Sequence, residues 1–426
     1  MPDSIPFYER SVLGNGLRVL TSSMPYTHSV AITVYIGAGS RYERDDMAGV
    51  SHFLEHMLFK GTEKWPTARE LAAKIDGVGG VMNGATDREL TMYYIKVARP
   101  HMDLALDVLF QLVHHPLIEA SEIEKERLVI LEELAMVADS PGQTADLLLD
   151  SLIWPDQPLG RDIAGSVDSV GQLSTDSLTG YMREQYVPNN VVVAVAGNLT
   201  HDEVVSAVQD GLGDWQPGKP ATWRPATQSN GRHVAVKYKN TEQANMSMAV
   251  HGLSLTHPDR HALSFLSIIL GEGMSSRLFV ELREQRGLAY DVSAYAMNLL
   301  DTGTFNIFTG VDPKNAAEAL KVIFGELERL ASGGPDGDEL VKARELSKGR
   351  LLLRLEDTRA VAGWIGAQEL LLDHVRTVDD AVAEMEAVTL EDLQRVSREI
   401  LDLRSLHLAI VGPFRSDKQF TALLRS

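Results

Sequence analysis

The run Val191–Gly197 (VVVAVAG) is apolar throughout and ends in glycine, and Leu406–Gly412 (LHLAIVG) closely matches it 215 residues later. Short apolar runs of this length, bounded by turn residues, are typical of buried strands. Two further pairs of segments have the same offset: Ala31–Gly37 with Met246–Gly252, and Leu173–Leu178 with Val388–Leu393. Because three pairs share one register, we interpret the chain as two homologous halves.

Each half has the same coarse order of elements. In the first half, strand-like runs over residues 17–22 and 31–37 precede helical patterns over 68–76, 102–112 and 122–137. Strands and helices that segregate in this way favour an α+β fold, in which a mostly antiparallel sheet carries helices on one face. We therefore expect two such domains, residues 1–215 and 232–426, joined by a linker rich in Pro and Gly over residues 216–231.

The composition excludes several classes of protein. The 426 residues are 44% hydrophobic and 23% charged, and no run reaches the roughly 20 apolar residues of a membrane helix. The absence of cysteine excludes disulfides and thiolate chemistry, so any metal must be bound by His, Asp or Glu. A net charge of −19 disfavours nucleic acid as a partner. Residues 1–6 lack the features of a secretory signal, and we expect a soluble, cytoplasmic protein without a membrane partner.

The segment Gly49–Thr62 (GVSHFLEHMLFKGT) carries the most chemistry. Its apolar residues recur at helical spacing and a glycine follows them, so we expect a helix that ends near Lys60. On such a helix His52, Glu55 and His56 share one arc, and the two imidazoles lie one turn apart. The order H-x-x-E-H is the inverse of the better-known H-E-x-x-H zinc motif.

A single histidine on an apolar helix is usually structural, but three titratable groups on one arc need compensation. Burying them costs several kcal/mol unless they are paired, and a divalent cation is the simplest partner. Two imidazoles can bind one ion, and a neighbouring carboxylate can reach water on that ion. The pattern predicts Zn²⁺ bound by His52 and His56, with Glu55 as the general base acting on the zinc-bound water.

Catalytic zinc uses three protein ligands, so a third ligand must come from another segment. A Glu-rich helix is expected to begin at Ser121, with Glu124 completing a capping box, and it places Glu126 and Glu133 on one face, two turns apart. A solvated acidic face is the simpler interpretation of this helix. Spacing alone does not decide between Glu132 and Glu133.

These residues resemble the pitrilysin/insulinase/mitochondrial-processing-peptidase family of zinc metallopeptidases (inverzincins), and in particular its short two-domain bacterial members. The resemblance covers essentially the whole chain and includes the duplication, the His52–His56 motif and three further segments: Gly37–Arg41, Gly79–Asn83 and Val129–Glu133. In that family 76 residues separate the second histidine from the third ligand, which implies Glu133. A family carboxylate one heptad before that ligand implies that Glu126 orients a metal-binding side chain.

The second half carries no such motif, since Ser, Ser and Ile stand at the aligned positions 264, 267 and 268. Family members carry an arginine and a tyrosine at the spacing of Arg283 and Tyr290. The resemblance implies that these two residues face the zinc, hold a substrate carbonyl or carboxylate and stabilise the oxyanion. Without the resemblance they would be interpreted as a surface cation and a strand tyrosine.

The glycine-rich segment 77–83 lacks the Lys-Ser/Thr of a phosphate-binding loop. In the family, the corresponding stretch is an edge strand to which the substrate adds by main-chain pairing. The resemblance therefore implies that Gly80 and Asn83 bind substrate. Gly84 stands where relatives commonly have alanine, and we expect this departure to leave function intact.

Together these features predict a zinc-dependent endopeptidase that hydrolyses unfolded peptides or oligopeptides. The alternative is a non-catalytic scaffold or core subunit of the same family, although such subunits have usually lost the ligands. Gln143 and Leu147 stand where processing peptidases carry acidic residues, so general peptide clearance competes with presequence processing. Long relatives have four domains, which implies that two copies of this chain form a homodimer whose sites are completed in trans by Arg283 and Tyr290.

Overall fold

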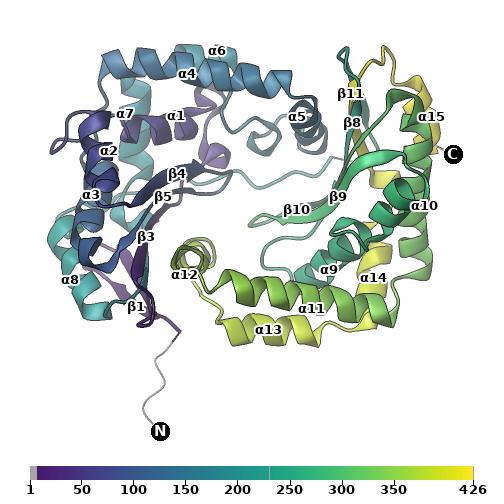
Figure 1. Cartoon of the computed structure of the whole chain (residues 1–426). Coiled ribbons are helices and arrows are strands. Elements are labelled where there is room, and N and C mark those ends of the chain that lie inside the picture. The colour runs from purple at the N-terminus through teal and green to yellow at the C-terminus, as the bar shows by residue number, and fades with distance from the viewer. Residues whose placement is uncertain (1–6, 230, 426) are drawn as a thin grey trace, which may run out of the picture. The chain divides into compact units, whose positions relative to one another are not determined.

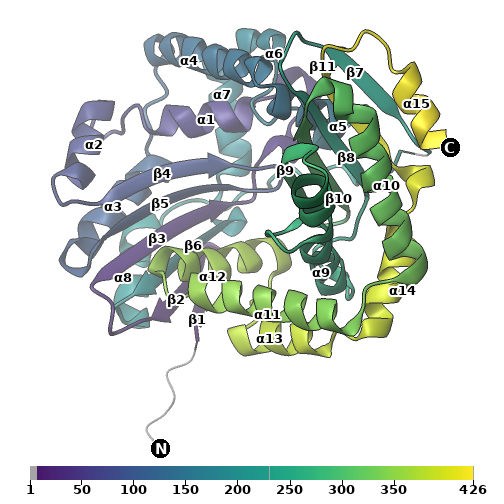
Figure 2. The same cartoon turned by 45° about the vertical axis from the view of Figure 1, so that its right-hand side comes forward.

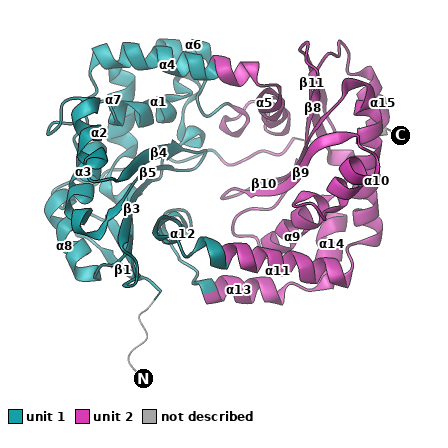
Figure 3. Ribbon diagram, in the orientation of Figure 1, with its two compact units in different colours: residues 1–134, 162–224, 352–378 teal, residues 135–161, 225–351, 379–426 magenta. Residues whose placement is uncertain are grey.

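The computed structural model describes residues 7–229 and 231–425, and its contacts divide the chain into two compact units (Figure 1; Figure 3). Unit 1 comprises residues 1–134, 162–224 and 352–378, and unit 2 comprises residues 135–161, 225–351 and 379–426. Residues 1–6, where no secretory signal is expected, lie outside the described residues, as does position 230 of the expected linker. Within the described ranges, no helix combines the length and the apolar character needed to cross a membrane.

The six-stranded sheet of unit 1 has the order β1-β2-β6-β3-β5-β4. Strands β2 and β6 pair in parallel, and the other neighbours pair antiparallel. The strands are β1 (Glu9–Val12), β2 (Arg18–Ser23), β3 (Ser29–Ile36), β4 (Val81–Thr86), β5 (Thr91–Ala98) and β6 (Val191–Gly197). Strand β4 therefore forms one edge of this sheet.

One face of this sheet carries most helices of unit 1. They are α1 (Val50–Leu58), α2 (Ala68–Asp76), α3 (Met102–His114), α4 (Ala120–Asp139, in this unit as far as residue 134), α6 (Val167–Gln172), α7 (Thr175–Gln185) and α8 (His201–Leu212). Ile32 of β3 and Phe53 of α1 belong to the large apolar core on this face. On the other face, Tyr35 and Ala194 pack with Ile365 of α12 (Thr358–Leu372). Figure 2 shows α12 beside β6.

Unit 2 repeats this plan with a five-stranded sheet in the order β7-β11-β8-β10-β9. Its strands are β7 (Val234–Tyr238), β8 (Ala244–His251), β9 (Ala289–Asn298), β10 (Gly303–Val311) and β11 (His407–Gly412), and β7 and β11 are the parallel pair. Its helices are α5 (Pro141–Ile153), α9 (Arg260–Gly271), α10 (Ala316–Gly333), α11 (Gly337–Arg354, in this unit as far as residue 351), α13 (Val378–Ala387, in this unit from residue 379), α14 (Leu390–Ile400) and α15 (Lys418–Arg425). The matching strand orders confirm the predicted fold class of two α+β domains with mostly antiparallel sheets.

The two halves of the sequence exchange a helix. Helix α5 lies in the first half, yet its Leu149 and Ile153 pack with Ala249 of β8 and Ala409 of β11 in unit 2. Helix α12 comes from the second half and packs in unit 1. The division into residues 1–215, 216–231 and 232–426 describes the halves of the sequence and stays a prediction, while the compact units group the chain differently.

Helix bounds follow local capping. Helix α2 spans Ala68–Asp76, as predicted, because Thr67 and Glu70 form a capping box at its start. The predicted start of α4 at Ser121 is wrong by one residue, and the structure does not show the capping box with Glu124. Glu124 instead binds Arg127, with 2.9 Å between Oε1 and Nη2.

Two glycines of α12 give a paired test of its packing on the sheet. A Cβ at Gly366 would lie 2.6 Å from the ring of Tyr35 and 2.7 Å from Ala194 Cβ, whereas one at Gly363 would lie 3.4 Å from Tyr35 Oη. We expect Gly366→Ala to destabilise the protein by about 1 to 3 kcal/mol through overpacking. Gly363→Ala should stabilise it by about 0.5 to 1 kcal/mol through helix propensity. Urea unfolding midpoints measure the stability of both variants. Midpoints that shift equally and in the same direction for the two variants would contradict this packing.

Candidate metal centre

Helix α1 begins at a glycine and is capped by a distant carboxylate. Gly49 has a φ of 91°, and a Cβ there would lie 2.5 Å from the carbonyl oxygen of Ala164. The buried carboxylate of Glu43 accepts hydrogen bonds from the backbone N–H groups of Gly49 (2.8 Å) and Ser51 (2.9 Å). These bonds satisfy donors that the helix itself leaves free. The capping role of Glu43 is not recognisable from the sequence, because this residue lies too far before the helix to match a local capping pattern.

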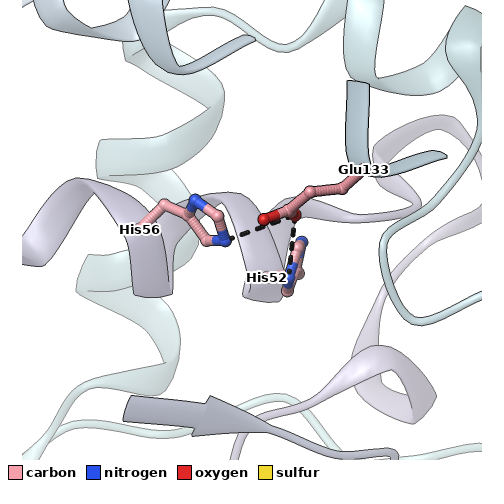
Figure 4. A group of neighbouring side chains, drawn as sticks. All are labelled: His52, His56 and Glu133. Carbon is pink, nitrogen blue, oxygen red and sulfur yellow. Dashed lines mark ion pairs between the residues drawn. The ribbon is translucent and has the colours of Figure 1, made fainter. Parts of the chain in front are cut away.

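Helices α1 and α4 bring three candidate ligands together, as Figure 4 shows. Glu133 Oε2 lies 3.8 Å from His52 Nε2 and 3.6 Å from His56 Nε2. One nitrogen or oxygen of each residue lies within 4.8 Å of the other two, and no other such group occurs in the described part of the chain. Glu132, the other carboxylate considered, is exposed and lies outside the group.

The chemistry of these three side chains fits a zinc ion. Two imidazole nitrogens and one carboxylate oxygen are the donor set of many catalytic zinc sites. Burial and the neighbouring His56 lower the pKa of His52 to about 4, so its imidazole is neutral at pH 7 and can donate a lone pair. His52 Nδ1 is buried and has no hydrogen-bond partner among the described residues. The group therefore fits a divalent cation, and its three members would be the ligands.

Glu126 holds His56 in a defined orientation. Its Oε1 accepts a hydrogen bond of 2.8 Å from His56 Nδ1, and its Oε2 binds the ammonium of Lys60. Glu126 is only 5% exposed. A proton on Nδ1 leaves the Nε2 lone pair of His56 free, and that nitrogen is the one near Glu133. The predicted position of Glu126 beside a metal-binding side chain thus has a physical basis, and Lys60 is an additional partner.

Glu55 is held by a threonine on the edge strand. Thr86 Oγ1 donates a hydrogen bond of 2.6 Å to Glu55 Oε2. Burial raises the pKa of Glu55, while this hydrogen bond lowers it. A carboxylate with a raised pKa is a better proton acceptor, and the bond from Thr86 fixes its direction. The role of Thr86 is not recognisable from the sequence, because no local pattern links β4 to α1.

Strand β4 presents a main-chain edge beside Glu55. Thr86 and Gly84 face α1, and a Cβ at Gly84 would lie 3.1 Å from Glu55 Oε1, so glycine relieves crowding here. The side chain of Asn83 is exposed, and its Oδ1 accepts a hydrogen bond of 2.8 Å from the backbone N–H of Gly84. Gly80 packs against α2, where its N–H donates to the carbonyl oxygen of Ile75. Substrate binding by Gly80 and Asn83 stays a prediction.

Arg283 and Tyr290 lie in unit 2. Arg283 is in a π-helix (Phe279–Gln285), and Tyr290 is on β9, with 74% of its surface exposed. The guanidinium carbon of Arg283 lies 4.9 Å from the centroid of the Tyr290 ring. The two side chains therefore form a cation–π pair, and their role toward substrate stays a prediction.

Comparisons with known proteins find relatives that span both halves of the chain. Residues 18–167 match the family described as Insulinase (Peptidase family M16), and residues 172–347 match the Peptidase M16 inactive domain. The chain is 38% identical to an uncharacterized zinc protease of Streptomyces coelicolor, over 97% of this chain and 91% of that protein. It is 36% identical to the uncharacterized zinc protease YmxG of Bacillus subtilis, over 95% and 98% of the two chains.

A solved structure has the same fold over its full length. The crystal structure of a protease from Helicobacter pylori aligns with a TM-score of 0.91 and 26% identity, and covers 96% of this chain and 100% of that one. These likenesses extend across both units rather than to the metal centre alone.

The hydrogen bond between Glu126 and His56 predicts that loss of Glu126 weakens metal binding. Glu126→Ala removes the group that orients His56, so we expect zinc to bind about 10- to 100-fold more weakly. Glu124→Ala is the matched control, because Glu124 lies on the same helix, is exposed and pairs with Arg127 instead of a histidine. Competition with a chromogenic chelator measures both dissociation constants. Equal affinities for the wild type and Glu126→Ala would refute this role.

Proposed function

This chain belongs to the M16 (insulinase) family of peptidases, and we propose that it is a zinc-dependent endopeptidase that hydrolyses unfolded peptides and oligopeptides. The observation that carries the proposal is the grouping of His52, His56 and Glu133, with Glu55 beside them on α1. The relatives described above are named zinc proteases, which supports both the metal and the class of reaction.

His52, His56 and Glu133 would hold the zinc ion. When bound, zinc supplies Lewis-acid chemistry, lowering the pKa of a water ligand to about 7 and polarising a carbonyl. Glu55 would accept a proton from the attacking water at its carboxylate and later deliver it to the leaving amine. Thr86 would keep that carboxylate directed during both transfers, since its hydroxyl binds the second oxygen.

The edge of β4 would select extended substrates. A peptide that pairs with this edge must expose its main chain, so unfolded segments fit and folded domains do not. Gly80 and Asn83 would flank that pairing. Glycine at position 84 keeps the space beside Glu55 open.

Arg283 and Tyr290 would complete the site from a second copy of the chain. A guanidinium can hold a substrate carbonyl or carboxylate, and a phenol can donate to the developing oxyanion. The exposure of Tyr290 supports a role at a surface that meets another molecule. A two-fold homodimer, the commonest closed assembly, would then contain two such sites.

The alternative is a non-catalytic subunit of the same family. The match of residues 172–347 to the M16 inactive domain favours it for the second half. The complete H-x-x-E-H motif and its neighbour Glu133 favour a catalytic first half.

Replacement of the proposed base separates metal binding from hydrolysis. We expect Glu55→Gln to retain zinc and to lose peptide hydrolysis, because an amide cannot accept the proton of water. His56→Ala should lose both zinc and activity. Elemental analysis and cleavage of a mixed peptide library measure the two properties, and near wild-type turnover by Glu55→Gln would exclude the assigned role.

Mixing two inactive proteins tests the dimer. Glu55→Gln and Tyr290→Phe homodimers should each be inactive, whereas a mixed dimer should regain one intact site and about half the wild-type activity if sites form in trans. Native mass spectrometry verifies subunit exchange. Exchange without recovery of activity, or a monomeric active species, would show that the trans arrangement is wrong.

A further inference from the structure

A pocket of about 440 Å³ lies within unit 1 between the sheet and the start of α12. Its wall on the sheet side comes from Tyr35 of β3 and from Met92 and Tyr94 of β5. Arg354, the last residue of α11, and Arg359, in the first turn of α12, also line it. The metal centre lies on the other face of the sheet, since α1 packs in the opposite core.

The pocket carries two guanidinium groups that no carboxylate pairs with among the described residues. Arg359 Nη1 donates to Tyr94 Oη at 2.7 Å, and its guanidinium carbon lies 4.8 Å from the centroid of that ring. Neither Arg354 nor Arg359 forms an ion pair within the described residues. Burial raises the pKa of Tyr35 to about 12, and the two guanidinium groups oppose this shift, which indicates that both charges act on the pocket.

The one acidic residue that lines the pocket is already engaged. Asp357 pairs with Lys96 at 2.5 Å, and its Oδ1 accepts from the backbone N–H groups of Arg359 (2.9 Å) and Ala360 (3.2 Å). Asp357 therefore caps the N–H groups at the start of α12. The positive charge of the pocket comes from the two arginine side chains and not from the end of this helix. Arg354 and Arg359 are both exposed, so their guanidinium groups are accessible to an anion from outside.

The strand register connects this pocket to the edge at β4. Asn83 pairs with Tyr94 and Ala85 pairs with Met92, so these four residues share the face that carries the pocket. A peptide strand added to β4 would lie about 10 Å from β5, because neighbouring strands are about 4.8 Å apart. Alternate side chains of that peptide would point to the same face. A long arginine side chain and an acidic side chain can together span this distance.

We propose that this pocket is a substrate subsite in which Arg354 and Arg359 bind a carboxylate of the peptide paired with β4. The carboxylate belongs either to an acidic side chain or to the C-terminus of the peptide. Guanidinium groups suit this task, because their N–H donors match the two oxygens of a carboxylate. The inference rests on the proposed function, since it assigns a preference to the same peptidase site.

The experiment compares peptides that differ in a single charge. One series moves a glutamate along an otherwise neutral peptide, with glutamine counterparts, and a second pairs C-terminal acids with C-terminal amides. We expect wild type to favour one acidic member by about tenfold in kcat/KM, mainly through KM. Arg354→Gln and Arg359→Gln should each reduce that preference severalfold and leave the neutral peptides unchanged. The series that responds identifies the source of the carboxylate.

Two controls separate this subsite from the proposed reaction. Arg404→Gln removes the same charge at an exposed residue of unit 2 and should leave the preference intact. Fluorescence anisotropy on Glu55→Gln measures binding of the same peptides without hydrolysis, in the background of each arginine variant. An acidic preference that persists in both arginine variants, or none in wild type, overturns the subsite while hydrolysis stands. Binding that depends on both arginines, without hydrolysis by wild type, supports the subsite and overturns the proposed function.

Discussion

The hydrogen bond between Glu126 and His56 is the contact on which the metal centre depends. Glu126 and Glu133 stand on one face of α4, two turns apart. By binding both His56 and Lys60, Glu126 joins α4 to the end of α1, and the same helix face then carries Glu133 to the histidines. Both oxygens of the buried Glu126 carboxylate have partners, so this carboxylate is paired whether or not the metal is bound.

The sequence was sufficient to predict the site residues that recur at helical spacing. His52, Glu55 and His56 share a helix arc, and Glu126 and Glu133 share another, so helical geometry alone put each set on one face. The choice of Glu133 over Glu132 needed the family resemblance. Glu43 and Thr86 were not predictable, because each acts through a loop or strand that the chain order does not relate to α1.

Fold class was predictable for a similar reason, since the repeated strands carry the signal of duplication. The exchange of α5 and α12 between the two halves was not predictable from the sequence. Both helices have ordinary apolar spacing, and an apolar face does not specify which of two homologous sheets it will cover. Contacts between distant segments decide that choice, and a single sequence contains no direct record of them.

The helix exchange also bears on how the protein folds and evolves. A chain cut within residues 216–231 would leave Leu20, Tyr35 and Val192 uncovered on one sheet and Ala249 and Ala409 uncovered on the other. Each fragment would present an apolar surface to water and carry the helix that the other fragment lacks. The halves are thus mutually dependent for solubility, and gene fission would be tolerated only where both products are made together and reassemble.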